Sequence, residues 1–154
     1  MCPNVLAALS LVALVGCGSD ALSRSDDAMK KPTVALPRDV VVVLDIYSGR
    51  PNPSWKPTAA ERAELGAMLE ALETSAPREP AEGRLGYRGF ALESAQDRGD
   101  APRVDIYTGV VRHRAGQTIT YWNDSGRQLE KWLLEKSRPH IGDGTYESVR
   151  AQLP

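Results

Sequence analysis

Blocks of hydrophobic residues alternate with polar stretches along the chain, and each block predicts one element. The clearest block is 39–47, Asp-Val-Val-Val-Val-Leu-Asp-Ile-Tyr, where four consecutive valines favour an extended strand buried on both faces. Residues 85–93 predict a second strand. The phase of its apolar positions changes between Tyr87 and Phe90, which indicates a bulge at Gly89.

Two capping signals predict helices. Residues 58–61, Thr-Ala-Ala-Glu, have the spacing of a capping box, and the following residues place one apolar face on a helix. That face comprises Leu65, Met68, Leu69 and Leu72. Pro77 and Pro80 are expected to end this helix, because proline cannot continue the hydrogen-bond pattern.

The second capping signal is 125–128, Ser-Gly-Arg-Gln. It precedes another apolar helical face, which comprises Leu129, Trp132 and Leu133 and is expected to stop at Pro139. Trp122 and Trp132 are interpreted as core residues.

Between these helices the chain predicts a hairpin. Residues 103–112 and 118–122 are the two strands, and they turn near Ala115-Gly116. The resulting order, β-α-β-β-β-α, predicts an α+β fold in which two helices pack on one face of a small, mostly antiparallel sheet.

One internal echo joins two parts of the chain. Residues 45–49, Asp-Ile-Tyr-Ser-Gly, are nearly repeated at 105–109 as Asp-Ile-Tyr-Thr-Gly. A duplicated half-domain would place two equivalent loops around one cleft, whereas coincidence between two amphipathic strands explains the echo without a cleft. The lengths between the matching segments differ, so coincidence is the favoured interpretation.

Composition narrows the class of protein. The chain has 154 residues, which fits a single folded domain. Its 19 basic and 20 acidic residues give a net charge of −1, so no overall basic field favours nucleic acid as a partner. The hydrophobic share of 42% is that of a globular chain.

The N-terminal segment has the pattern of a signal peptide. Residues 5–15 form an eleven-residue apolar run without a charge, which is too short to span a bilayer as a helix. The run ends in Leu14-Val15-Gly16-Cys17, which resembles the lipobox of bacterial lipoproteins. The resemblance implies that residues 1–16 are removed and that the Cys17 thiol carries a diacylglycerol.

Two features qualify this resemblance. No Lys or Arg precedes the apolar run, which departs from the usual signal peptide. Gly18 stands where many inner-membrane lipoproteins have Asp, so the resemblance implies the outer membrane in a host with two membranes. The alternative is a buried N-terminal element with an ordinary Cys17. If Cys17 is lipidated and Cys2 removed, the mature domain has no thiol for a disulfide or a metal.

The sequence after the lipobox divides into two parts. Residues 17–37 are expected to form the lipidated N-terminus and a flexible tether, and about twenty such residues span roughly 25 Å. Residues 38–154 are expected to form the single globular domain.

No catalytic or metal-binding signature is present in the sequence, and no cofactor is expected. His113 and His140 lie in different segments without a second ligand at helical or hairpin spacing. Residues 142–147 resemble a fragment of a calcium loop but lack its alternating acidic ligands, so they predict a turn. Asp45 and Asp105 would face each other if their strands pair, which leaves carboxylate-based glycoside hydrolysis open.

The strongest candidate for recognition is 48–55, Ser-Gly-Arg-Pro-Asn-Pro-Ser-Trp. Its prolines make the loop stiff and poorly suited to sheet pairing, and the proposed binding residues are Arg50, Asn52 and Trp55. The phrase resembles one in small uncharacterised bacterial proteins and implies no activity. The structural alternative, which is favoured, has Trp55 covering the core and Arg50 bonding local carbonyls.

Another basic group is Arg112-His113-Arg114. If these three side chains lie together at a hairpin tip, they provide a contact for an anionic envelope polymer.

Together these patterns predict a lipid-anchored protein of the cell envelope, in the outer membrane and facing the periplasm or the cell surface. It is expected to bind a protein or an envelope polymer as an accessory module and not to act as an enzyme. Two alternatives stay open: an envelope hydrolase using carboxylates, and a purely structural assembly protein.

Overall fold

A computed structural model describes residues 33–34, 36–78, 86–96 and 101–153. The chain divides into the units Met1–Lys30 and Lys31–Pro154, and every described residue belongs to the second unit. The predicted signal peptide, Cys17 and most of the tether therefore lie outside the described residues, as do Pro80 and Leu85. Among the described helices, none is long and apolar enough to cross a membrane.

Within the described residues, seven strands form one antiparallel sheet in the order β2-β1-β4-β5-β6-β7-β3. Their bounds are β1 Val40–Leu44, β2 Ser54–Trp55, β3 Glu73–Thr74, β4 Phe90–Ser94, β5 Arg103–Tyr107, β6 Val110–Ala115 and β7 Thr118–Asn123. The two edge strands have two residues each, and each pairs with only two residues of its longer neighbour.

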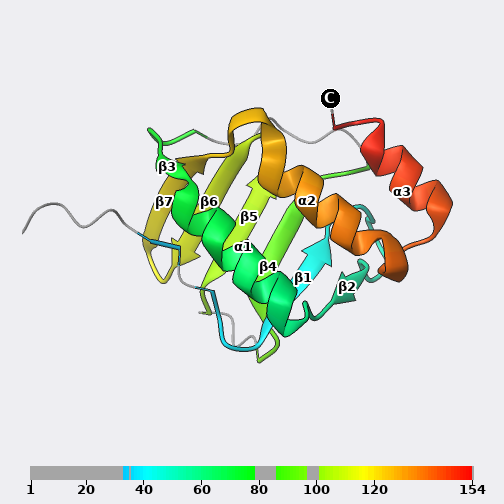
Figure 1. Cartoon of the computed structure of the whole chain (residues 1–154), viewed down its shortest axis with the longest axis horizontal. Helices are drawn as coiled ribbons and strands as arrows, with labels where there is room; N and C mark the ends of the chain where they lie inside the picture. Colours follow the sequence, from blue (N-terminus) through cyan, green and yellow to red (C-terminus); the bar gives the residue numbers. More distant parts are fainter. Residues whose placement is uncertain (1–32, 35, 79–85, 97–100, 154) are drawn as a thin grey trace, which may run out of the picture. The chain divides into compact units, whose positions relative to one another are not determined.

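The described part of the chain also contains three α-helices: α1 Ala59–Ala71, α2 Gln128–Ser137 and α3 Asp143–Arg150. Helices α1 and α2 cross the same face of the sheet, and α3 lies beside them near the C-terminus (Figure 1). The predicted α+β class and antiparallel sheet are thus confirmed. The third helix was not predicted: residues 142–147, expected as a turn, contain the start of α3.

The core lies between the sheet and α1 and α2. Along β1 the buried residues alternate, with Val40, Val42 and Leu44 at most 3% exposed and Val41 and Val43 half-buried. The prediction that this strand is buried on both faces was therefore wrong. An antiparallel sheet covered by helices on one face needs only every second side chain in the core.

Helix α1 begins with the predicted capping box. The Thr58 hydroxyl accepts a bond from the Glu61 backbone N–H at 3.2 Å, and the Glu61 carboxylate accepts from the Thr58 backbone N–H at 2.9 Å. The bond from Thr58 also lowers the pKa of Glu61. The helix ends at Ala71, well before Pro77, because the chain turns into β3 and pairs with β7.

The predicted strand 103–112 is two strands. Thr108 and Gly109 have φ values of 51° and 76°, and this left-handed pair makes a tight turn between β5 and β6. The sequence did not indicate a turn at Thr108, because threonine rarely adopts a positive φ. The second hairpin, between β6 and β7, turns after Ala115 as predicted.

Helix α2 is capped by a different residue from the one predicted. The side chain of Asp124, 3% exposed, accepts bonds from the backbone N–H groups of Leu129 at 3.1 Å and Glu130 at 3.2 Å. Ser125–Arg127 instead form a short 3₁₀ turn. Burial raises the pKa of Asp124, and the two backbone bonds oppose this rise.

The N-terminal boundary of the folded domain lies earlier than expected. Val34 is 4% exposed within the core cluster, and Leu36 packs against that cluster. Arg62 of α1 donates to the Pro37 carbonyl at 2.7 Å. Residues 33–34 and 36–37 therefore belong to the domain and not to a flexible tether, and the domain begins before residue 38.

Gly89 allows β4 to approach β5 closely. Its φ is +102°, and a Cβ at this position would lie 2.2 Å from the carbonyl oxygen of Ile106. The predicted irregularity at this residue thus coincides with a backbone that only glycine fits.

We expect Gly89→Ala to lower the free energy of unfolding by more than about 3 kcal/mol, because backbone atoms must move to admit the methyl group. Gly116→Ala is the matched control: its φ is also positive, but no atom lies within 4 Å of the added Cβ. Its cost should be about 1 kcal/mol. Urea denaturation of the full chain measures both, and equal losses would contradict the role given to Gly89.

Candidate functional site

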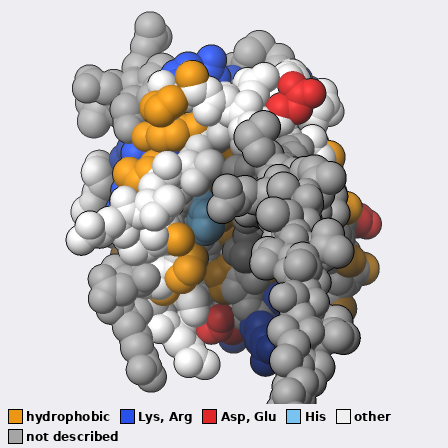
Figure 2. All heavy atoms as spheres, turned by 90° about the vertical axis from the view of Figure 1, so that its left-hand side faces the viewer, with side chains coloured by type: hydrophobic (Ala, Val, Ile, Leu, Met, Phe, Trp, Pro, Cys, Tyr) orange, Lys and Arg blue, Asp and Glu red, His pale blue; other side chains and the backbone are white. Residues whose placement is uncertain are grey.

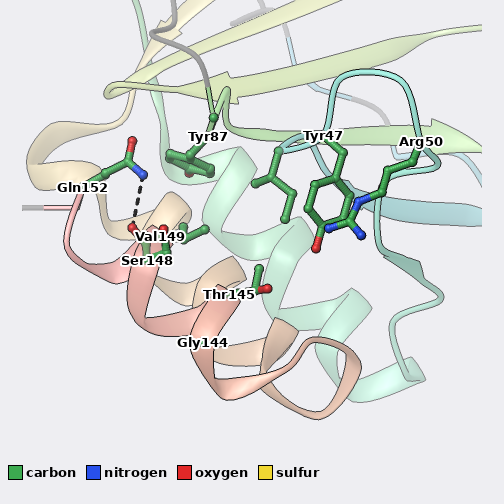
Figure 3. Close-up of a pocket in the computed structure, with 10 residues that line it drawn as sticks. Tyr47, Arg50, Tyr87, Gly144, Thr145, Ser148, Val149 and Gln152 are labelled. Carbon is green, nitrogen blue, oxygen red and sulfur yellow. Dashed lines mark hydrogen bonds between the residues drawn. The ribbon is translucent and has the colours of Figure 1, made fainter.

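A cavity of about 370 Å³ lies between the loop after β1, the segment before β4 and helix α3 (Figure 3). Its size falls at the lower end of the range for small-molecule sites. The lining residues are Ile46, Tyr47, Arg50, Gly86, Tyr87, Gly144, Thr145, Ser148, Val149 and Gln152. Arg50 is the only charged side chain among them.

The loop wall of the cavity is shaped by Asn52. Its side-chain oxygen accepts bonds from the backbone N–H groups of Ile46 at 3.0 Å and Tyr47 at 2.8 Å. Its amide nitrogen donates to the Asp45 carboxylate at 2.8 Å. The Asn52 side chain thus holds the loop together, and Asn52 is not among the residues that line this cavity.

Arg50, which the sequence analysis proposed as a binding residue, is among the residues that line the cavity. Its guanidinium carbon is 3.4 Å from the centre of the Tyr47 ring, and both side chains stand together on one side of the cavity in Figure 3. Arg50 is exposed and forms no ion pair within the described part of the chain. It is a free cation whose position is set by stacking on an aromatic ring.

Trp55 lies in the hydrophobic core, where the structural alternative placed it, and does not line the cavity. It is 6% exposed, stacks on His140 at 5.2 Å between ring centres and meets Phe90 edge-on at 6.4 Å. It also lies in β2, opposite Val42 of β1. The expectation that prolines keep this loop out of the sheet was wrong, because Ser54 and Trp55 themselves are free to pair.

The inner wall of the cavity depends on a buried carboxylate. Glu130 of α2 is 0% exposed, and the Tyr87 hydroxyl donates to its Oε1 at 2.6 Å. Arg127 donates to the same carboxylate through two nitrogens, each at 2.8 Å. The third donor group of Arg127 reaches the Gln152 carbonyl at 3.0 Å, after α3. One buried group therefore joins three segments of chain.

The surroundings of this cluster favour the protonated forms of the Tyr87 hydroxyl and the Arg127 guanidinium. Burial, and then the charge of Glu130, raises the pKa of Tyr87 far above its ordinary value, so its hydroxyl stays protonated and donates. The hydrogen bonds to Glu130 raise the pKa of Arg127. The sequence held one signal for this cluster, because Glu130 falls on the apolar stripe of its helix between Leu129 and Leu133.

Helix α3 forms the outer wall. Tyr146 and Val149 are buried against the domain, which turns the hydroxyl residues Thr145 and Ser148 toward the cavity (Figure 3). Gln152 donates to the Ser148 carbonyl at 3.1 Å and closes the end of the helix. The short apolar spacing in this helix, with only two buried residues, explains why the sequence pattern did not predict it.

The two candidate carboxylates do not face each other across paired strands. Strand β4 lies between β1 and β5, so Asp45 and Asp105 do not belong to paired strands. Arg88 donates to Asp45 through Nε at 3.1 Å, while Arg103 at 2.6 Å and Arg112 at 3.0 Å donate to Asp105. The two echoed segments also differ locally, since 45–49 follows a strand and 105–107 lie within one.

The basic triplet does not form a cluster at a hairpin tip. Arg112, His113 and Arg114 are successive residues of β6, so their side chains alternate between the two faces of the sheet. His113 lies 6.2 Å from the Trp122 ring, its buried Nε2 has no hydrogen-bond partner, and burial lowers its pKa. In Figure 2, which shows this end of the molecule, the Lys and Arg side chains drawn in colour form no continuous patch.

The described residues contain no group of three His, Cys, Asp or Glu side chains that could hold a metal ion. No family model, no curated protein and no solved structure matches the chain. The chemistry of the cavity is therefore the basis for a functional interpretation. One free cation, two hydroxyl groups and apolar walls can bind and orient a small molecule.

We expect Glu130→Gln to reduce the free energy of unfolding by about 3–5 kcal/mol, because it leaves the guanidinium of Arg127, whose side chain is only 16% exposed, without its charge partner. Glu147→Gln breaks an exposed i,i+3 pair with Arg150 and should leave stability almost unchanged. Urea denaturation of both variants tests this difference. A loss as small in Glu130→Gln as in the control would contradict the structural weight given to the buried carboxylate.

Proposed function

We propose that the chain is a lipid-anchored protein of the cell envelope, and that its domain acts as a binding module through the cavity around Arg50. The observation that carries this proposal is the lining of the cavity. It combines one unpaired guanidinium with hydroxyl groups and apolar walls, and its described residues include no carboxylate or histidine to act as a general base.

The anchor rests on the sequence before the domain. The apolar run 5–15 and the lipobox-like Leu14-Val15-Gly16-Cys17 support removal of residues 1–16 and lipidation of Cys17. Since the packed domain begins by residue 33, the tether shortens to residues 18–32. Fifteen residues of coil span about 21 Å. That distance holds the domain close to the membrane, on the periplasmic side or at the cell surface.

The hydrolase alternative finds less support in the contacts. A general acid needs a carboxyl group in an environment that favours the protonated form, and a nucleophile needs an accessible one. Asp45 and Asp105 are both held by guanidinium groups, and neither lines the cavity. The remaining alternative, a purely structural assembly role, predicts an empty cavity and is tested below.

A photoreactive phenylalanine analogue tests the binding role in the producing cell. At position 148, on the cavity side of α3, it should form one dominant adduct that mass spectrometry locates on this residue. The control is position 147, which is exposed on the same helix and does not line the cavity. No adduct, or the same adduct from both positions, would favour a purely structural role.

The same cells test the anchor. The wild-type chain should sediment with membranes and carry a mass increase from acyl chains on a protein that begins at Cys17, since two or more acyl chains bind a bilayer stably. Cys17→Ala should appear in the soluble fraction. An unmodified wild-type chain beginning at Met1 would contradict the anchor.

A further inference from the structure

We infer that the cavity recognises a small carboxylate carried on a compact apolar body. The inference rests on the proposed function in one respect only, that this cavity is the binding site. It adds the chemical class of the ligand, which follows from the charge, the donor geometry and the walls of the cavity.

Charge comes first. The two other arginines close to this region are neutralised within the fold, Arg88 by Asp45 and Arg127 by Glu130. Arg50 has no such partner in the described residues, and no acidic side chain lines the cavity. The lining therefore carries a single positive charge. A carboxylate, with one negative charge, matches it, whereas a phosphate dianion would leave a surplus of negative charge.

The orientation of Arg50 suits a planar acceptor. Stacking on Tyr47 at 3.4 Å occupies the face of the guanidinium and leaves the N–H groups along its edge for in-plane acceptors. A carboxylate accepts two parallel bonds from such an edge, and these charge-assisted bonds are stronger than bonds between neutral groups. The ring also holds the guanidinium in one place, so less side-chain entropy is lost on binding.

The facing wall supplies further donors. Thr145 and Ser148 present hydroxyl groups from α3, across the cavity from Arg50 (Figure 3). Gly144, in the first turn of this helix, also lines the cavity and adds no charge to it. Asp143, in the same turn, is exposed and does not line the cavity. Both walls thus favour a negative group between them.

The apolar part of the cavity lining determines what kind of ligand body fits. Ile46, the Tyr87 ring and Val149 are apolar, and the Tyr87 hydroxyl is already used by Glu130. A volume of about 370 Å³ corresponds to roughly a dozen water molecules. This space fits a single acylated amino acid or a ligand of similar size, and it excludes a folded chain.

Titration of the full chain in detergent micelles tests the inference, with N-acetyl-leucine as the probe and backbone amide shifts as the readout. N-acetyl-leucine should shift the amides of Gly86, Gly144, Thr145 and Ser148 in a saturable manner. N-acetyl-leucinamide, which has the same body without the charge, should bind at least tenfold more weakly. Phenyl phosphate is the third probe and should also bind more weakly than the carboxylate.

Two variants give the matched control. Arg50→Gln should weaken the binding of N-acetyl-leucine at least tenfold, whereas Arg114→Gln, which removes an exposed charge from β6, should not change it. Equal binding of the acid and the amide, no shift with any probe, or tighter binding of phenyl phosphate would each overturn the carboxylate assignment. Those results would leave the crosslinking experiment at position 148 unaffected. The two experiments therefore distinguish a wrong ligand class from a wrong binding site.

Discussion

A buried carboxylate imposes the strictest constraint on this fold. Glu130 has no contact with solvent, and a charge in that position must be met by donors from the protein itself. The donors come from Tyr87, before β4, and from Arg127, at the start of α2. Because Arg127 also binds the Gln152 carbonyl, the chain after α3 is held by the same cluster. Removing the Glu130 carboxylate would leave both the Tyr87 hydroxyl and two nitrogens of Arg127 without their acceptor.

The cavity is a consequence of that cluster and of one smaller anchor. The cluster places the Tyr87 ring and the end of α3, which form two walls, and Asn52 folds the loop that forms the third. Each polar group in these anchors is used within the fold. Arg50 is the exception, since it touches Tyr47 and leaves its edge donors unused in the described structure. The proposed recognition therefore centres on Arg50, the one charged residue among the described residues that line the cavity.

The sequence predicted what depends on local pattern. The α+β class, the cap of α1 and the second hairpin follow from periodicity, capping spacing and turn residues. Sequence patterns did not predict the features that depend on contacts between distant segments. Pairing with β1 placed Trp55 in the sheet, and the Asp124 side chain took the cap that Ser125 seemed to offer. Of the proposed binding residues, only Arg50 lines the cavity, because periodicity does not reveal which polar side chains fold a loop.

The most direct test of this account is amide hydrogen exchange in the wild-type chain and in Tyr87→Phe, which removes one hydroxyl bond to Glu130. The account predicts that the amides of Arg88 and Gln152, both hydrogen-bonded to backbone carbonyls, lose protection together by about tenfold or more. The amide of Ala115, in the distant hairpin of β6 and β7, should keep its wild-type rate. Faster exchange at Arg88 alone, with Gln152 unchanged, would show that the buried carboxylate does not hold the cavity together.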